Sequence, residues 1–251
     1  RRRTRYRSAM TVRIASYNIH KCLGLDRRRS EHRIMEVLAE VDADIVALQE
    51  VDHRLGPRKA ALPRALIAAS SDYVAPEFAL NGVSLGWHGQ SILVRRGLAV
   101  TRLQRIELPG LEPRGAILTE IEGPEGALRV VGVHLGLVRR YRLMQMAAVR
   151  AAISHHGDVP TVILGDFNEW SARGGMAPLS DGFRVHAPGR SYPAMRPVAS
   201  LDRIAVGAGL HMIHAGVHAS KLARVASDHL PVWAEVRMDA KPSPAPAPSA
   251  S

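Results

Sequence analysis

The stretch that decides the fold is Leu164-Gly165-Asp166-Phe167-Asn168-Glu169, which continues the apolar run Val162-Ile163-Leu164. A run of Val, Ile and Leu bounded by Gly and Asp predicts a buried β-strand. Because side chains alternate along an extended chain, Asp166 and Asn168 are expected on the same side. A carboxylate beside a carboxamide at a strand end suits a water, a divalent cation or a phosphate.

Three further segments place similar ligands next to strand-like runs. Ser227-Asp228-His229-Leu230-Pro231 precedes the apolar run 232–236, and a carboxylate beside an imidazole is a recurring way to hold a metal and stabilise charge on a phosphate. Ser16-Tyr17-Asn18-Ile19-His20 and Ala47-Leu48-Gln49-Glu50 each end an earlier run. In the first of these, Asn18 and His20 are expected on the same side of the strand. Taken singly, the Asn is an ordinary turn former and the Glu an ordinary solvated charge.

Three more positions have both a structural and a functional interpretation. His134 ends the apolar run 131–135, where a lone His is more often structural. Asp202 lies inside an apolar strand and either forms a salt bridge to Arg203 or a neighbour, or orients His229 by fixing its tautomer. Arg114 is either a phosphate clamp or a surface charge.

Strand-like runs outnumber helical patterns along the chain. Helices are expected at Glu31–Glu40, around Ala61–Ala69 and at Arg139–His155, from apolar residues at helical spacing. Many strands with a few helices indicate two packed sheets covered by helices, an α/β sandwich. Strands are predicted at 11–17, 44–49, 90–95, 98–107, 115–122, 127–135, 160–165, 201–206 and 230–237.

Length and composition fit one domain of 251 residues with 46% hydrophobic residues. We expect a basic disordered extension at residues 1–9, one folded domain at 10–238 and a disordered Pro/Ala/Ser tail at 239–251. No run approaches the ~18–20 apolar residues of a membrane span. The single Cys22 excludes an internal disulfide, and a cytoplasmic location is expected.

The net charge of +11 favours a polyanionic partner. Five of the 34 Lys and Arg residues fall in residues 1–7, however, which leaves 29 basic against 23 acidic residues and a net charge of +6 for the rest. The same field would attract nucleic acid, membrane phosphates or small phosphoesters.

The joint order of these residues is more specific than any one of them. Asn, Glu, His, Asp-x-Asn, Asp and Asp-His, each at a strand end, resemble the endonuclease/exonuclease/phosphatase superfamily of DNase I-like, metal-dependent phosphoesterases. The resemblance spans roughly residues 12–236. It implies a four-layer α/β sandwich, with two mostly antiparallel sheets flanked by helices and a Mg²⁺ site at the rim.

The resemblance also implies a role for each matching residue. Glu50 would be the principal Mg²⁺ ligand, with Asn18 and Asp228 assisting, and Mn²⁺ is an alternative ion. Members that act on abasic DNA carry an Asp two residues after the first Asn, and here that position is His20. His20 could bind a second metal or a phosphate, because imidazole suits Mn²⁺ or Zn²⁺ better than Mg²⁺.

The remaining roles concern the reaction itself. Asp166 would position or deprotonate the attacking water, and Asn168 and His134 would contact the phosphate. His229, oriented by Asp202, would stabilise the pentacovalent phosphate or take part in acid–base catalysis. Arg114 would lie in a strand that helps to shape the site and bind the substrate.

Three functions follow from these assignments, and the first is preferred. The first is a nuclease-type phosphodiesterase that acts on nucleic acid, as a monomer. The second is a phosphatase or phospholipase-C-like hydrolase of lipid or inositol phosphates, although the sequence shows no apolar hairpin of the kind that bilayer-acting members carry. The third is a non-catalytic module that binds nucleic acid or membranes.

Overall fold

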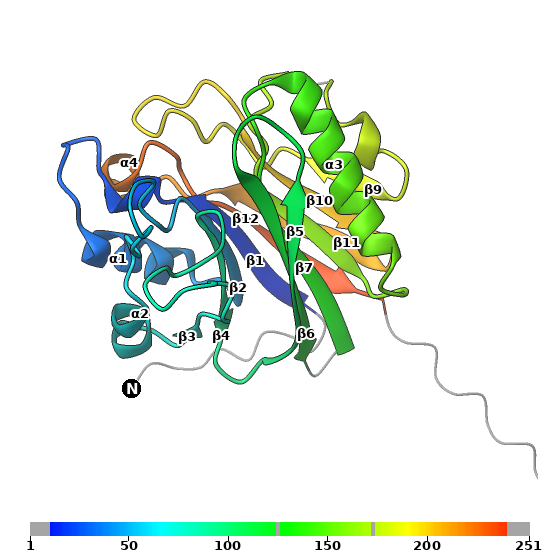
Figure 1. Ribbon diagram of the computed structural model, residues 1–251, viewed down its shortest axis with the longest axis horizontal. Helices are drawn as coiled ribbons and strands as arrows, with labels where there is room; N and C mark the ends of the chain where they lie inside the picture. The colour runs from blue at the N-terminus through cyan, green and yellow to red at the C-terminus, as the bar shows by residue number, and fades with distance from the viewer. Residues whose placement is uncertain (1–10, 124–125, 172–173, 240–251) are drawn as a thin grey trace, which may run out of the picture.

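The computed structural model describes residues 11–123, 126–171 and 174–239, and these form two six-stranded sheets packed face to face (Figure 1). The first sheet has the spatial order β11 (Leu210–Val217), β12 (Val232–Met238), β1 (Thr11–Asn18), β2 (Ile45–Gln49), β4 (Gln90–Arg95) and β3 (Tyr73–Val74). The second has the order β5 (Ala99–Leu108), β6 (Arg114–Gly123), β7 (Gly126–His134), β8 (Thr161–Asp166), β10 (Asp202–Gly207) and β9 (Phe183–His186).

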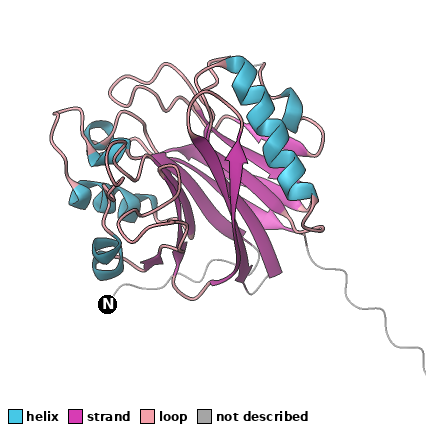
Figure 2. Ribbon diagram, viewed as in Figure 1, coloured by secondary structure: helices cyan, strands magenta, loops and turns pink. Residues whose placement is uncertain are grey.

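Helices cover the outer face of each sheet, so that the fold has four layers (Figure 2). The first sheet carries the 3₁₀ turn η1 (His20–Cys22), α1 (Glu31–Val41), α2 (Arg64–Ser70) and α4 (Ala223–Ala226). The second carries α3 (Arg139–Ser154) and the 3₁₀ turn η2 (Ala177–Leu179). The predicted four-layer α/β sandwich of mostly antiparallel sheets is therefore confirmed.

Three apolar cores hold the layers together. Because side chains alternate along a strand, one strand can contribute to the cores on both of its faces. In β2, Val46 and Leu48 pack towards the helices of the first sheet. Ile45 and Ala47 point the other way, into the core between the two sheets. A third core packs Met146 of α3 against the second sheet. A strand buried on both faces reads as an unbroken apolar run, which explains why these strands could be recognised in the sequence.

Two parallel strand pairs decide where the functional side chains lie. β1 pairs with β2, and β7 pairs with β8, whereas all other neighbours run antiparallel. Parallel strands end at the same edge of a sheet. Asn18 and Gln49 are therefore opposite one another, as are His134 and Asp166. In addition, antiparallel β10 begins at Asp202, directly opposite Asp166.

Gly165 is required for this pairing. A Cβ built at residue 165 would overlap the carbonyl oxygen of Val133, its register partner on β7. Only glycine lets the two strands approach one residue before Asp166. The Gly-Asp order in the deciding stretch thus has a steric cause.

Each of the nine predicted strands is present, with ends shifted by at most a few residues. The prediction omitted β3, β9 and α4, which are short, and it did not assign β11, which is an edge strand with an irregularity at Met212/His214. The second helix begins at Arg64 instead of Ala61, because Pro63 is extended and disfavours a helix before it. The expected extension at 1–9 and all but Asp239 of the expected tail lie outside the described residues.

Candidate metal-dependent active site

Asp166 is the centre of the candidate site, at the edge where β1, β2, β7 and β8 end. Its Oδ2 lies 3.2 Å from Asn18 Nδ2, 3.5 Å from His134 Nε2 and 3.7 Å from His229 Nε2. Its Oδ1 accepts a hydrogen bond from the backbone N–H of Asn168 at 2.9 Å. Asn18 contacts this buried carboxylate although it lies 148 positions from Asp166 in the sequence.

The turn that follows β8 is set by Asn168. Its φ of 49° lies in the left-handed region, so strand alternation does not extend past Asp166. Asn168 Nδ2 donates to the carbonyl oxygen of Leu135 at 2.9 Å, which ties this turn to the end of β7. The two motif residues lie close together, as expected, but through a turn and not through strand alternation.

Asp202 and His229 form a buried pair beside Asp166. His229 Nδ1 lies 2.9 Å from Asp202 Oδ2, which also accepts a hydrogen bond from Ser191 Oγ at 2.5 Å. The Tyr192 ring packs against the imidazole, with 4.9 Å between ring centroids. The ring of His229 is therefore held so that Nε2 faces Asp166. The structure favours orientation of His229 over the alternative of an Asp202–Arg203 pair.

The two active-site imidazoles are in different electrostatic environments. Burial opposes the charged form of His229, but the nearby Asp202 and Asp166 outweigh burial and raise its pKa to about 10. For His134, burial and then the charge of Arg114 hold the pKa well below its usual range. At neutral pH the site therefore contains one imidazolium and one neutral imidazole. Burial also raises the pKa of Asp166 to about 6, although His229 partly counteracts this.

Glu50 directly follows β2, with a φ of 57° that turns the chain out of the sheet. Its carboxylate pairs with Lys21 Nζ, and Arg54 Nη2 lies 3.8 Å from its other oxygen. Burial alone would raise the pKa of Glu50. The protonated form of His134, the hydrogen bond and charge of Lys21 and the charge of Arg54 outweigh burial and lower the pKa to about 2. The carboxylate is therefore ionised at any ordinary pH.

Asp228 is anchored to the end of β1. The preceding Ser227 Oγ donates to the carbonyl oxygen of Asn18 at 2.7 Å, and Asp228 Oδ1 lies 3.7 Å from His20 Nδ1. The His20 backbone N–H donates to Asn18 Oδ1 at 3.1 Å. The expectation that Asn18 and His20 share one side of a strand is wrong, because β1 ends at Asn18 and His20 opens a 3₁₀ turn.

The donor set fits a hydrated Mg²⁺ ion. Asn18, Glu50 and Asp228 offer amide and carboxylate oxygens, which are the ligands that this ion prefers, and Mg²⁺ usually keeps several waters. In the described part of the chain, no group of three or more His, Cys, Asp or Glu side chains is arranged to hold a metal ion. A site with few protein ligands and several waters agrees with both observations.

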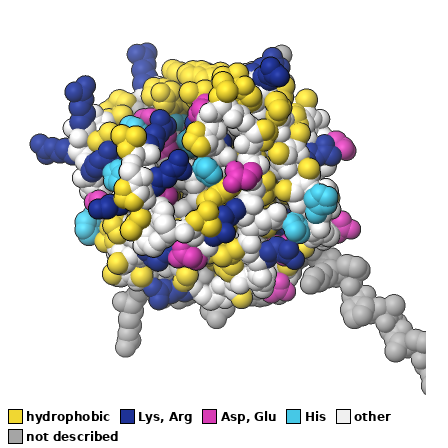
Figure 3. All heavy atoms as spheres, viewed as in Figure 1, with side chains coloured by type: hydrophobic (Ala, Val, Ile, Leu, Met, Phe, Trp, Pro, Cys, Tyr) yellow, Lys and Arg dark blue, Asp and Glu magenta, His cyan; other side chains and the backbone are white. Residues whose placement is uncertain are grey.

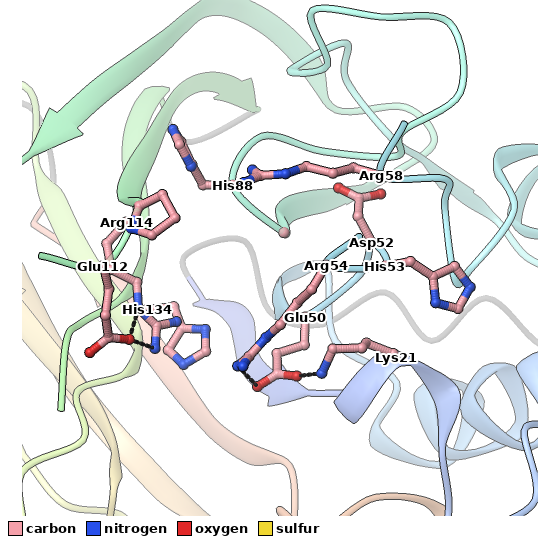
Figure 4. Close-up of a pocket in the computed structure, with 12 residues that line it drawn as sticks. Lys21, Glu50, Asp52, His53, Arg54, Arg58, His88, Glu112, Arg114 and His134 are labelled. Atoms are coloured by element: carbon pink, nitrogen blue, oxygen red, sulfur yellow. Dashed lines mark hydrogen bonds and ion pairs between the residues drawn. The ribbon is translucent and has the colours of Figure 1, made fainter. Parts of the chain in front are cut away.

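A pocket of about 310 Å³ opens beside this cluster (Figure 4). Lys21 and Arg54 reach Glu50 from either side, and His134 lies at the same wall. Arg114 also lines the pocket, where Glu112 holds it with an Nη2–Oε2 distance of 2.7 Å. The placement of Arg114 next to His134 suits contact with a phosphate more than a surface charge.

The chain also matches a known family of proteins. The sequence profile of the Endonuclease/Exonuclease/phosphatase family matches residues 15–229, which is most of the chain. The chain belongs to this family. A search of curated proteins returned no match.

Solved structures with the family fold resemble this chain over nearly its whole length. An endonuclease/exonuclease/phosphatase family protein from Bacteroides thetaiotaomicron has 18% identity and a TM-score of 0.74, over 91% of this chain and 98% of its own. TDP2 of D. rerio, complexed with a single-strand DNA product, has 19% identity and a TM-score of 0.70, over 91% and 99%. A protein from Beutenbergia cavernae has 21% identity and a TM-score of 0.66, over 91% and 72%.

Three further side chains of the candidate site carried no signal in the sequence. Lys21 binds Glu50 across 29 positions, Ser191 supports Asp202, and Glu112 holds Arg114. The η1 turn brings Lys21, whose φ is 56°, next to Glu50. The local residue pattern does not predict that conformation. Side chains that act by supporting others are found only once the strands are paired.

Proposed function

We propose that this member of the endonuclease/exonuclease/phosphatase family is a divalent-metal-dependent phosphodiesterase that attacks its substrate in line with an activated water. One observation supports this most: Asp166 lies between an amide, a neutral imidazole and an imidazolium, all within 3.7 Å. In-line attack needs an activated water and stabilisation of the charge that develops on the phosphate. The site offers both on a single rigid edge.

Each side chain has one task in this proposal. Asp166 orients the water and accepts its proton, and Asn168 contacts a phosphate oxygen. His134, neutral and next to Arg114, donates a hydrogen bond to the phosphate. His229, kept protonated by Asp202, stabilises the negative charge that grows on the phosphate. Hydrogen-bonded groups of this kind contribute about 10²–10⁴-fold each.

Mg²⁺, or Mn²⁺ in its place, would be held by Glu50, Asn18 and Asp228, and it would supply Lewis-acid stabilisation of the phosphate when bound. His20 Nδ1 lies 3.7 Å from Asp228 Oδ1, so in this proposal His20 contacts Asp228 or a phosphate. It does not form a second metal site of its own. We therefore propose one principal ion.

Nucleic acid is the first candidate substrate. The net charge of +11 suits a polyanion, and the solved TDP2 complex contains single-strand DNA in the same fold. A lipid phosphodiester is the second candidate, favoured by exposed apolar side chains around the site. Either substrate is compatible with a monomer in the cytoplasm.

Glu50→Ala and His229→Ala test the reaction class. Both should abolish Mg²⁺-dependent hydrolysis of a soluble diester, bis(p-nitrophenyl) phosphate, while the circular dichroism spectrum stays unchanged. EDTA should remove the activity of the parent protein. The matched control is His211→Ala, because His211 also pairs with an aspartate, Asp239 at 2.8 Å, but does so away from the site. Near-normal turnover in either folded active-site variant would disprove the assignment.

The substrate class needs a separate panel, run with Mg²⁺ or Mn²⁺ and an EDTA blank. Supercoiled plasmid, abasic duplex and single strands represent nucleic acid, and sphingomyelin and inositol phosphates represent the alternative. Nicking of plasmid that disappears in Glu50→Ala supports a nuclease. Hydrolysis of lipid substrates without nicking would replace the first candidate by the second.

A further inference from the structure

Six large apolar side chains stand out from the loops around the active site. We call them the apolar rim: Leu111, Leu137, Val138, Trp170, Met195 and Val198. Each has between 51% and 83% of its surface exposed. Single exposed apolar residues are ordinary, but several on neighbouring loops mark an interaction surface.

Contacts between the loops join these residues into one surface. The backbone N–H of Leu137 donates to Glu112 Oε1 at 3.2 Å, which links the loop of Leu111 to the loop before α3. Arg142 of α3 pairs with Glu169 at 2.9 Å, next to Trp170. The Trp170 ring lies 6.1 Å from the ring of Tyr192, which itself packs on His229.

Met195 and Val198 belong to the loop that also carries Tyr192. Val198 donates its backbone N–H to the carbonyl oxygen of Tyr192 at 2.8 Å, and Arg224 Nη1 of α4 donates to the carbonyl oxygen of Met195 at 3.2 Å. The apolar rim therefore runs from the loop before β6, past α3 and Trp170, to the loop before β10. Two contacts connect it to the site: Trp170 reaches His229 through the Tyr192 ring, and Leu111 precedes Glu112, which lines the pocket.

The charge around the apolar rim is positive. Arg139 and Arg140 at the start of α3, and Arg190 and Arg196 on the loop before β10, are exposed. The sequence has no Asp or Glu in residues 126–157 or in residues 187–201. In Figure 3 hydrophobic side chains cover much of the upper edge of the molecule, where Figure 1 places these loops, and Lys or Arg side chains project from that edge.

We propose that the apolar rim docks on the surface of an anionic phospholipid bilayer. Docking would bring the second candidate substrate, a lipid phosphodiester, to Asp166 in place of nucleic acid. This inference deepens the proposed function and rests on it for the hydrolysis, but not for the docking. The apolar side chains lie next to exposed arginines, and the two neighbouring acidic residues, Glu112 and Glu169, are paired with Arg114 and Arg142. Such a surface fits the acyl boundary and the anionic headgroups of a bilayer. Aliphatic side chains would add nothing to contact with a nucleic-acid backbone, which binds through cations and aromatic stacking.

The contact would be shallow. No helix within the described residues is long and apolar enough to span a membrane. The apolar rim consists of single side chains on separate loops. It therefore does not show in the sequence as a continuous apolar hairpin. Insertion of these tips would hold the pocket opening at headgroup level.

Vesicle binding in EDTA tests docking without hydrolysis. The full chain is sedimented with vesicles of phosphatidylcholine alone, or with about one third phosphatidylglycerol. We expect binding to the anionic vesicles at least tenfold above the neutral ones. Arg139→Gln/Arg140→Gln should weaken it by about 25-fold, from roughly fivefold per cation near an anionic surface. Arg237→Gln, an exposed arginine on β12, is the matched control.

A second pair of variants tests the contribution of the apolar side chains. Leu137→Ser/Val138→Ser should lower binding by about tenfold or more, because two exposed aliphatic groups no longer enter the bilayer. Val74→Ser/Leu103→Ser is the control: Val74 is 50% exposed, against 51% for Val138, and both control residues lie on strands. Residue 138 is the N-cap of α3, where Ser is favoured, so the helix is expected to remain.

The outcomes separate docking from catalysis. The rim variants should hydrolyse bis(p-nitrophenyl) phosphate as fast as the parent protein. If the parent protein itself does not hydrolyse this diester, the result counts against the proposed function and not against docking. Absence of vesicle binding, or binding that the rim variants leave unchanged, would overturn the docking proposal. Binding of a single-stranded oligonucleotide that the rim variants weaken, together with no vesicle binding, would assign the rim to nucleic acid and overturn it too.

Discussion

Replacing Asp202 by Asn tests whether this carboxylate keeps His229 protonated. Asp202 is fully buried, and its Oδ2 lies 2.9 Å from His229 Nδ1. Asn keeps the shape and an oxygen that can accept the hydrogen bond from Ser191, but it removes the negative charge. The substitution therefore isolates the electrostatic part of the pair.

The size of the effect follows from the distance. Two unit charges 2.9 Å apart interact by roughly 6 kcal/mol at an effective dielectric constant of about 20. At about 1.4 kcal/mol for each pH unit, the pKa of His229 should fall from about 10 to ~6. The sign for stability follows. A pKa raised above the ordinary ~6.5 stabilises the folded protein fully below that pH, and the contribution is lost as pH rises to about 10.

The pH profile of kcat/KM with the soluble diester is the assay. Activity should require an ionised Asp166, whose pKa is about 6, and a protonated His229, so the parent protein should show a plateau from about pH 6 to about pH 10. Asp202→Asn should convert the plateau into a narrow bell near pH 6. At pH 8 only ~1% of His229 would be protonated, so kcat/KM should be about 100-fold below the parent value.

Two results would refute this reasoning. One is an Asp202→Asn profile that keeps the plateau to pH 9. The other is an equal loss of kcat/KM at every pH, which would give Asp202 a structural role only. Nitrogen-15 NMR of the His229 imidazole in metal-free protein reads the pKa directly. Ser191→Ala, which removes the 2.5 Å hydrogen bond but no charge, is the control and should leave the profile broad.

Two further predictions concern the scaffold. Gly165→Ala should lower the free energy of unfolding by more than about 3 kcal/mol and reduce activity, because the new Cβ would force β8 away from Val133; a urea midpoint within error of the parent would contradict the steric argument. Arg129→Met should cost about 2–3 kcal/mol, since the buried guanidinium pairs with Glu120 at 2.8 Å. A thermal midpoint lowered by roughly 5–10 °C with unchanged kcat/KM is expected, and a loss of activity at unchanged stability would disprove it.

The strands could be predicted because burial on both faces leaves a local record. β2 and β8 are wholly buried, so each reads as an unbroken apolar run. β11 leaves no such record, because its outer face is exposed at an edge and its register is interrupted between Met212 and His214. Pro63 shows the limit at helix ends, where one residue moved the start of α2.

The apolar rim shows a second limit. Leu111, Trp170 and Met195 are unremarkable in sequence, each standing alone in its own loop. They form a surface only after the loops are joined through contacts such as Leu137 to Glu112 and Trp170 to Tyr192. A search for a continuous apolar hairpin could not detect them.

The sequence by itself determined the nine predicted strands and the polar side chains at their ends, because both follow from residues within a few positions of one another. The tertiary structure decided how those ligands combine. The parallel pairs β1–β2 and β7–β8 bring Asn18 and Asp166 to 3.2 Å, and the buried Asp202 raises the pKa of His229. Distance and burial set the strength of a charge interaction, and for residues far apart in the chain both exist only after folding.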